Sequence, residues 1–391
     1  MWLQNVMPIE KDCVDRLYEQ REKLIIIGLT GRTGAGCTTV ANILSKDNLS
    51  DMDLHSPKTR DFRNSDERKY SIIRKYMNNE RWKAFTIIEA STIIFSFFAN
   101  ESLENFFEYL DGYKGEISDK DKLKKELCKF ALNKDNLNIN DIEVDEFLDK
   151  HKNIKLVPEI EHFYFNEMKE EENPDRLLEI ISFYTKKLKD RKNTFKKITE
   201  KCMYTNNEKE FNLYSFLLQE IGNNIRSSGN PFDDNFEPGN EMRVAERINE
   251  LVKIINLYEE RKDKKEIKER KRTRICIDAF RNPLEIQYFR DRYRSFYVFA
   301  VNTEDSDRKN RLGLKRSQMD SLDEIEYPQK HKENYDIFYH QDIQACLEIA
   351  DVYLYNPDVT NQHYYMLTEQ LLKYIALMLQ PGLVTPTHLE R

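Results

Sequence analysis

The chain has 391 residues, 34% of them charged, and a formal net charge of −7. This charge excludes a global basic field, so a general nucleic-acid binder is not expected. The mixed, mostly basic run 261–274 predicts a solvated helix face, and a local nucleic-acid contact is the alternative. The six cysteines stand singly, without a Cys-x-x-Cys pair, which argues against a zinc knuckle and a disulfide framework. The longest apolar stretch, 86–99, is interrupted by Glu89 and is too short to span a bilayer. We therefore predict a soluble, cytoplasmic protein with no membrane partner.

Four short apolar runs interrupt an otherwise helical pattern and predict buried parallel strands. They lie at residues 23–29, 274–277, 296–301 and 351–355. Each is followed by a loop with Gly, Asp, Asn or Pro, and helical periodicity separates the runs, as in βαβ units. The predicted fold class is therefore α/β, with a parallel sheet flanked by helices.

The section between the first two runs, about 65–272, is helical in pattern and far too long for one crossover helix. It predicts a large helical insertion at about residues 101–215, within one domain that spans residues 1–379. Apolar residues recur at helical spacing in 360–379 and predict a last helix, whose apolar stripe could pack against a partner. Residues 380–391 are polar, contain two prolines and predict an extended tail.

The first predicted strand runs into a glycine-rich segment that matches the phosphate-binding pattern Gly-x-x-x-x-Gly-Lys-[Ser/Thr] at every position but one. The segment consists of Gly31, Arg32, Thr33, Gly34, Ala35, Gly36, Cys37 and Thr38, with Thr39 after it. Glycines let the backbone wrap a phosphate chain, and a helix N-terminus points unpaired N–H groups at it. Thr38 takes the position whose hydroxyl would hold Mg²⁺. The alternative is a fortuitous glycine-rich turn.

Cys37 stands where the pattern has its lysine. Loss of one preorganised charge donor typically lowers a rate by roughly 10²–10³, whereas the backbone N–H groups still bind phosphate. Three alternatives stay open for this position. In the first, Arg32 supplies the missing positive charge from within the loop. In the second, a lysine from elsewhere in the chain supplies it. In the third, the thiol has a lowered pKa at a helix N-terminus and is redox-sensitive.

A second group of polar residues follows the second predicted strand. Asp278 comes at its end, where parallel sheets bind ligands, and can hold Mg²⁺ or accept a substrate proton. Arg281 can bind a phosphate through both sides of its guanidinium, and Glu285 on the next predicted helix can orient it. The alternative is a surface cluster that caps a helix.

Two further segments carry arginines that would face phosphate groups. Arg226 follows Gly222 in the segment 218–226 and would face a monophosphate. Arg308 and Arg311 lie just past the third predicted strand, in a segment suited to a lid over phosphates. For this last segment a solvated basic helix is the alternative.

Together, the loop, residues 219–222, residues 278–285 and the Arg308/Arg311 segment resemble the deoxynucleoside monophosphate kinase branch of the P-loop kinases. More narrowly, the chain resembles the N-terminal kinase-like domain of the anti-phage dCTP/dCMP deaminases. The pieces that carry this narrower resemblance are 67–70 with Trp82 and Phe85, 278–283, 350–356, and the tail 381–386 with 390–391. The tail resembles the start of that family's deaminase domain. The His-x-Glu and Pro-Cys-x-x-Cys motifs that hold zinc in such domains do not occur in this sequence, so no zinc is expected.

Three functions are compatible with these residues. The first is a sensor that binds a nucleoside or deoxynucleoside triphosphate with Mg²⁺ and passes its occupancy to a deaminase domain or subunit. The second is an active ATP-dependent (deoxy)nucleoside monophosphate kinase, with Asp278 near the acceptor and Arg226, Arg281 and Arg308 as clamps. The third is an interaction scaffold with a vestigial nucleotide site. The missing lysine favours the sensor, because sensing needs binding and not turnover. We also expect a homo-oligomer.

Overall fold

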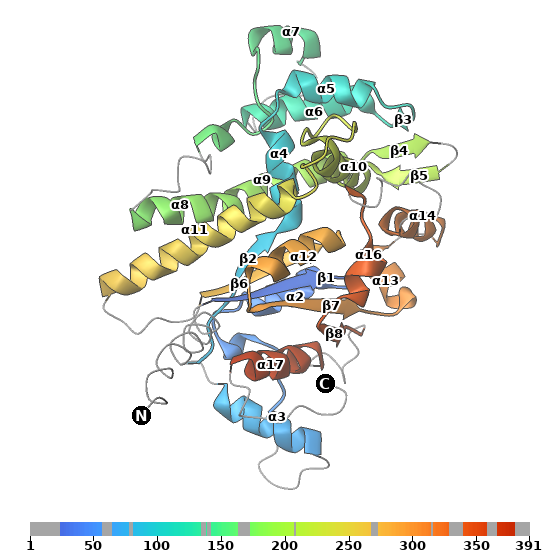
Figure 1. The fold of residues 1–391 in the computed structure, drawn as a ribbon. Coiled ribbons are helices and arrows are strands. Elements are labelled where there is room, and N and C mark those ends of the chain that lie inside the picture. The colour runs from blue at the N-terminus through green and yellow to red at the C-terminus, as the bar shows by residue number, and fades with distance from the viewer. Residues whose placement is uncertain are drawn as a thin grey trace, which may run out of the picture.

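The protein has an α/β fold built on one five-stranded parallel sheet that is flanked by helices (Figure 1). The chain also forms a smaller, three-stranded antiparallel sheet, whose strands lie in the sequence between the second and third strands of the main sheet. The computed structural model describes residues 24–56, 65–77, 81–133, 138, 142–162, 173–206, 209–266, 273–313, 316–327, 339–357 and 366–379.

The elements have the following bounds. The strands of the main sheet are β1 (Leu24–Thr30), β2 (Thr86–Glu89), β6 (Thr273–Phe280), β7 (Phe296–Asn302) and β8 (Val352–Tyr355). Those of the smaller sheet are β3 (Glu116–Ile117), β4 (Met203–Asn206) and β5 (Lys209–Asn212). The helices before β6 are α2 (Cys37–Leu44), α3 (Ser65–Tyr76), α4 (Ala90–Ala99), α5 (Leu103–Asp111), α6 (Lys120–Leu132), α7 (Val144–Lys150), α8 (Pro174–Ser182), α9 (Leu188–Thr199), α10 (Leu213–Ser228) and α11 (Arg243–Glu266). The later ones are α12 (Pro283–Arg292), α13 (Asp305–Leu312), α14 (Arg316–Glu326), α16 (Ile343–Glu348) and α17 (Met366–Leu379).

The main sheet has the strand order β2-β6-β1-β7-β8, and each neighbouring pair is parallel. Because β1 lies in the middle, it is buried on both faces, from Ile25 to Thr30. Successive side chains of a strand point to opposite faces. Ile26 accordingly belongs to one hydrophobic core, whereas Ile25 and Ile27 belong to the other. This double burial explains the unbroken apolar run of the strand.

The four predicted strands are confirmed, with small shifts of their ends. The fifth strand, β2, does not stand out in the sequence, because it continues into α4 without a turn residue. The whole stretch 86–99 therefore reads as one apolar run. Pairing with β6 decides that its first four residues are extended, and this pairing places Glu89 opposite Asp278.

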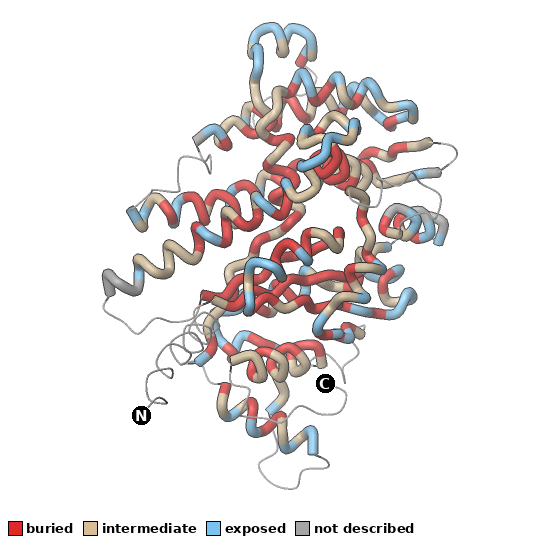
Figure 2. The backbone as a smooth tube through the Cα atoms, viewed as in Figure 1, coloured by how far each residue is buried: buried red, intermediate tan, exposed pale blue. Residues whose placement is uncertain are grey.

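Different helices cover the two faces of the sheet. On one face α2, α3 and α17 share a core with the sheet, which includes Val40, Tyr70 and Leu371. On the other face α4, α10, α11 and α12 belong to a larger core. Figure 2 shows the buried residues along the strands and on the inward sides of these helices.

The predicted insertion, about 101–215, contains helices α5 to α9, as expected, and also the three-stranded sheet, which was not expected. It is packed as a continuation of one face of the main sheet. The ring of Phe195 in α9 lies 5.5 Å and 5.4 Å from the rings of Phe95 and Phe98 in α4. These aromatic residues share one core with Ile277 of the main sheet.

The apolar stripe of the last helix is used within the chain. Leu367, Leu371 and Ile375 of α17 are buried in the core that α2 and α3 also form. These residues of the stripe therefore pack within the chain. The predicted tail, 380–391, lies outside the described residues. Among the helices that the structure describes, none is both long and apolar enough to cross a bilayer.

Gly28→Ala is expected to destabilise the protein. An added Cβ would lie 2.6 Å from Cε2 of Phe280 and 2.9 Å from Cε2 of Phe296, and both rings are buried. Overpacking of this kind costs about 1–3 kcal/mol, which a denaturant titration would measure as a lower free energy of unfolding. Gly112→Ala is the matched control, because an added Cβ there meets nothing closer than 3.5 Å. Equal stabilities of the two variants would contradict the packing around β1.

Candidate functional site

The glycine-rich loop, Gly31–Thr38, joins β1 to α2 at the carboxyl edge of the main sheet. Gly34 and Gly36 have φ values of 84° and 109°, a conformation that residues with a side chain rarely adopt. Helix α2 begins at Cys37, so its first N–H groups, which have no partner within the helix, face the loop. Thr38 and Thr39 are exposed at this helix end. The predicted strand–loop–helix arrangement is thus present, and it can bind an anion.

The loop is held from outside through its carbonyl groups. Asn356, which follows β8, donates a hydrogen bond of 2.8 Å to the carbonyl of Ala35. Arg311 of α13 donates to the carbonyls of Gly34 and Ala35, at 3.4 Å and 3.3 Å, and to that of Asn356 at 2.9 Å. Arg311, which the sequence had suggested as a phosphate contact, therefore braces the loop through backbone carbonyls.

Thr38 and Asp278, the two predicted Mg²⁺ ligands, lie together. The Thr38 hydroxyl donates to Oδ2 of Asp278 at 3.0 Å. Burial, and then the charge of Glu89, raise the pKa of Asp278 to about 6. Among the described residues no group of three or more His, Cys, Asp and Glu could hold a metal by itself. The pair nevertheless fits Mg²⁺, which commonly takes one or two protein oxygens and completes its shell with phosphate oxygens and water.

A buried ion-pair cluster, which sequence reasoning missed, lies beside Asp278. Glu89, opposite Asp278 on the neighbouring strand, accepts hydrogen bonds from Lys192 at 2.5 Å and from Lys189 at 2.6 Å. Both lysines come from α9 of the insertion, and Lys192 is only 5% exposed. Burial raises the pKa of Glu89, but the two lysines outweigh it and the net shift is downward. A glutamate inside an apolar run was the one available signal, since an ionisable residue there needs a partner.

The thiol of Cys37 is not activated. Its enclosure in the protein, and then the charge of Asp278, raise its pKa well above the ordinary value for a thiol. The thiolate, which is the reactive form, is therefore disfavoured. The direction is opposite to the lowered pKa that the redox-sensitive alternative requires.

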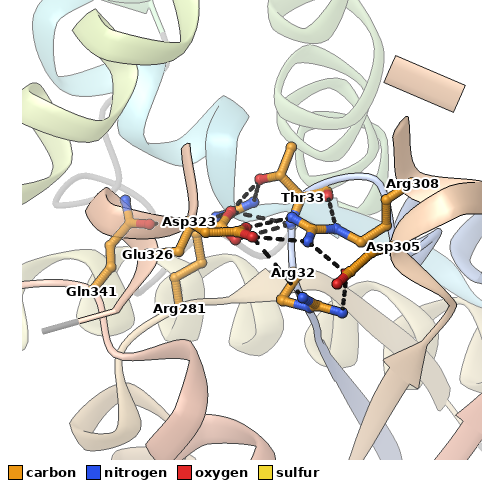
Figure 3. A network of polar contacts seen from close by, with 8 residues as sticks. All are labelled: Arg32, Thr33, Arg281, Asp305, Arg308, Asp323, Glu326 and Gln341. Carbon is orange, nitrogen blue, oxygen red and sulfur yellow. Dashed lines mark hydrogen bonds and ion pairs between the residues drawn. The ribbon is translucent and has the colours of Figure 1, made fainter. Parts of the chain in front are cut away.

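Figure 3 shows a network of polar contacts around Thr33 of the loop. Arg281 donates to the Thr33 hydroxyl at 2.8 Å and to Oε1 of Glu326 at 2.5 Å. Glu326, the last residue of α14, is completely buried and also accepts from the N–H of Thr33 at 3.1 Å and 3.2 Å. Arg281 is thus oriented by Glu326. The expected partner, Glu285, bonds elsewhere.

Arg308, predicted as a phosphate clamp, is fully buried and already paired in this network. Its guanidinium contacts Asp323 at 2.6 Å and 3.1 Å, and its Nε donates to the Thr33 carbonyl at 3.0 Å. Arg32, the candidate for a charge from within the loop, pairs with Asp305 at 2.7 Å. Both arginines are therefore paired with carboxylates of the protein.

Arg226 belongs to a row of buried polar residues on α10. Its Nε donates to Oε1 of Glu285 at 2.8 Å, and both side chains are almost fully buried. Gln219, Asn223 and Arg226 lie on one face of the helix because they are spaced by four and three residues. Each has one buried polar atom without a hydrogen-bond partner, namely Oε1, Oδ1 and Nη1. Such atoms are rare in folded proteins and indicate a place for a polar ligand or water.

This α10 row and the loop lie at the same edge of the sheet. Asn223 is 3.2 Å from Nδ1 of His340, and the His340 carbonyl accepts from Asn282 at 3.0 Å. The next residue, Gln341, is 3.4 Å from Nη1 of Arg281. The contacts therefore connect the row to the residues around Thr33.

The pKa of Asp278 predicts a pH-dependent stability. A folded-state pKa of about 6, above the ordinary 3.8, means that the folded protein keeps a proton that the unfolded chain has released. The contribution of Asp278 to stability is therefore lost as the pH rises from about 4 to above 6. The loss is about 3 kcal/mol at most, because one pKa unit corresponds to about 1.4 kcal/mol.

The measurement is the difference in the free energy of unfolding between wild type and Asp278→Asn, taken at pH 4 and pH 7. We expect the wild type to lose stability relative to the variant across this interval. A constant difference would show that Asp278 has an ordinary pKa in the folded protein.

Comparison of the chain with protein-family models, with characterised proteins and with solved structures finds no significant match.

Proposed function

We propose that this chain binds a nucleoside or deoxynucleoside triphosphate with Mg²⁺ and acts as a nucleotide sensor. The observation that carries the proposal is the contact of 3.0 Å between the Thr38 hydroxyl and Asp278, at the end of a loop with two left-handed glycines. A hydroxyl and a carboxylate in this relation are what Mg²⁺ on a phosphate chain takes from a protein.

Each part of the site has a role in this proposal. The N–H groups of the loop and of the first turn of α2 bind phosphate oxygens. Mg²⁺, when bound, neutralises part of the phosphate charge, and Thr38 and Asp278 would hold it. Because Mg²⁺ competes with the proton on Asp278, its affinity should fall below about pH 6.

The α10 row supports a place for the base or sugar. A nucleobase edge presents donors and acceptors, which match the unpaired Oε1 of Gln219, Oδ1 of Asn223 and Nη1 of Arg226. A ligand that hydrogen-bonds to these buried atoms would bind more tightly, since an unsatisfied buried polar group costs about 1–3 kcal/mol. The segment 218–226 thus supports recognition of the nucleoside part, while the loop binds its phosphates.

The state of the charged residues favours sensing over turnover. Cys37 provides no cation, and its pKa keeps the thiol neutral. Arg281, Arg308 and Arg32 are each paired with a carboxylate. The resemblance to the kinase-like domain of anti-phage deaminases would make a deaminase domain or subunit the reader of nucleotide occupancy.

Gly36→Ala is expected to abolish nucleotide binding. The added Cβ would lie 2.0 Å from Nδ2 of Asn356 at a φ of 109°, so the loop has to move. Gly313→Ala is the matched control, because it also has a positive φ but meets nothing within 4 Å. Calorimetry with MgATP and each Mg-dNTP should show binding for wild type and control only. Absence of heat with every nucleotide for the wild type would refute the proposed function.

A working (deoxy)nucleoside monophosphate kinase is the second candidate, and one observation favours it. Lys192 brings a buried ammonium group to Glu89, beside Asp278, and is a candidate for the relocated lysine. In a sensor, wild type shows negligible ADP release with any dNMP, and Cys37→Lys raises the rate by about 10²-fold relative to Cys37→Ser. Acceptor-dependent ADP release by the wild type that Lys192→Met removes would establish the kinase instead.

A further inference from the structure

The carboxylate of Glu326 occupies an anion position in the glycine-rich loop. Its two oxygens accept from the N–H of Thr33 at 3.1 Å and 3.2 Å, and Oε1 also contacts the Thr33 hydroxyl and Arg281. A loop N–H and a guanidinium are the donors with which proteins bind phosphate oxygens. Glu326 therefore offers these donors the same kind of partner that a nucleotide phosphate would offer.

Glu326 is not a surface residue that happens to touch the loop. It is 0% exposed and ends α14, the helix that follows the Arg308/Arg311 segment. One turn earlier, Asp323 of the same helix binds Arg308 at 2.6 Å. Two carboxylates of α14 thus take up two arginines, Arg281 and Arg308, that the sequence marks as phosphate clamps (Figure 3).

We propose that the Thr33 N–H and Arg281 form a subsite for one phosphate group of the nucleotide, and that Glu326 competes for it as an internal anion. Binding of the phosphate displaces Glu326 and moves α14 away from the loop. The inference rests on the proposed nucleotide binding and specifies how that binding is controlled.

Displacement of α14 also supplies a route for the signal. The helix packs against β5 of the smaller sheet, in the insertion (Figure 1). Its carboxylates hold it to the loop, and the same helix contacts β5. When a phosphate replaces Glu326, the contact between α14 and β5 changes. Binding at the loop thereby alters the structure of the insertion.

Removal of the competing charge tests this proposal. Glu326→Gln keeps the shape of the side chain but offers the subsite a neutral group. We expect it to bind MgATP and inorganic triphosphate about tenfold or more tightly than wild type in calorimetry, because the competing internal state is weakened. Asp320→Asn, an equal change of charge at an exposed position of α14, is expected to bind like the wild type.

Glu326→Ala serves as the second variant, because a glutamine amide can still accept from the Thr33 N–H. Hydrogen exchange of residues 316–326 in the wild type should increase when MgATP is added. If the wild type binds but neither variant binds more tightly, or if the exchange of residues 316–326 does not change, Glu326 is a fixed structural contact of the loop. Either outcome overturns this inference and leaves the proposed function standing. If no variant and no wild type binds either probe, the proposed function itself fails, and this inference fails with it.

Discussion

Charges that are buried at the carboxyl edge of the sheet have to meet opposite charges or hydrogen-bond donors, because an unpaired buried charge is strongly destabilising. Asp278 meets Thr38, Glu89 meets Lys192, and Glu326 meets Arg281. These pairs join segments that are far apart in the sequence. The pairs bring α9 beside Asp278 and α14 to the glycine-rich loop.

The insertion is part of the site for the same reason. Helix α9 packs through Phe195 on α4, whose preceding strand ends at Glu89, so Lys192 reaches the edge where Asp278 lies. Helix α14 connects the other side, because it contacts the loop through Glu326 and the smaller sheet through β5. Contacts from α9 and α14 therefore connect the insertion to this edge of the sheet at two places.

Local patterns predict well where one short segment carries the whole signal. The four strands were predicted because burial on both faces leaves an unbroken apolar run. The loop was predicted because its backbone conformation requires glycines at fixed positions. Thr38 and Asp278, each predicted as a Mg²⁺ ligand, lie within hydrogen-bond distance, since both are near the carboxyl edge of one parallel sheet. The partners of the arginines were harder to predict. Arg281, Arg308 and Arg311 lie near the loop as expected, but no sequence pattern pairs them with Glu326, Asp323 and Asn356.

The sequence by itself determined the fold class, the place of the glycine-rich loop and the presence of Cys37 where the phosphate-binding pattern has a lysine, because each depends on neighbouring residues of the chain. The tertiary structure alone decided the strand identity of β2, the burial of Lys192 beside Glu89 and the position of Glu326 in the loop. These features depend on electrostatic pairing and strand pairing across hundreds of residues. A carboxylate on an ordinary amphipathic helix looks like a solvated residue until the fold shows which cation it meets.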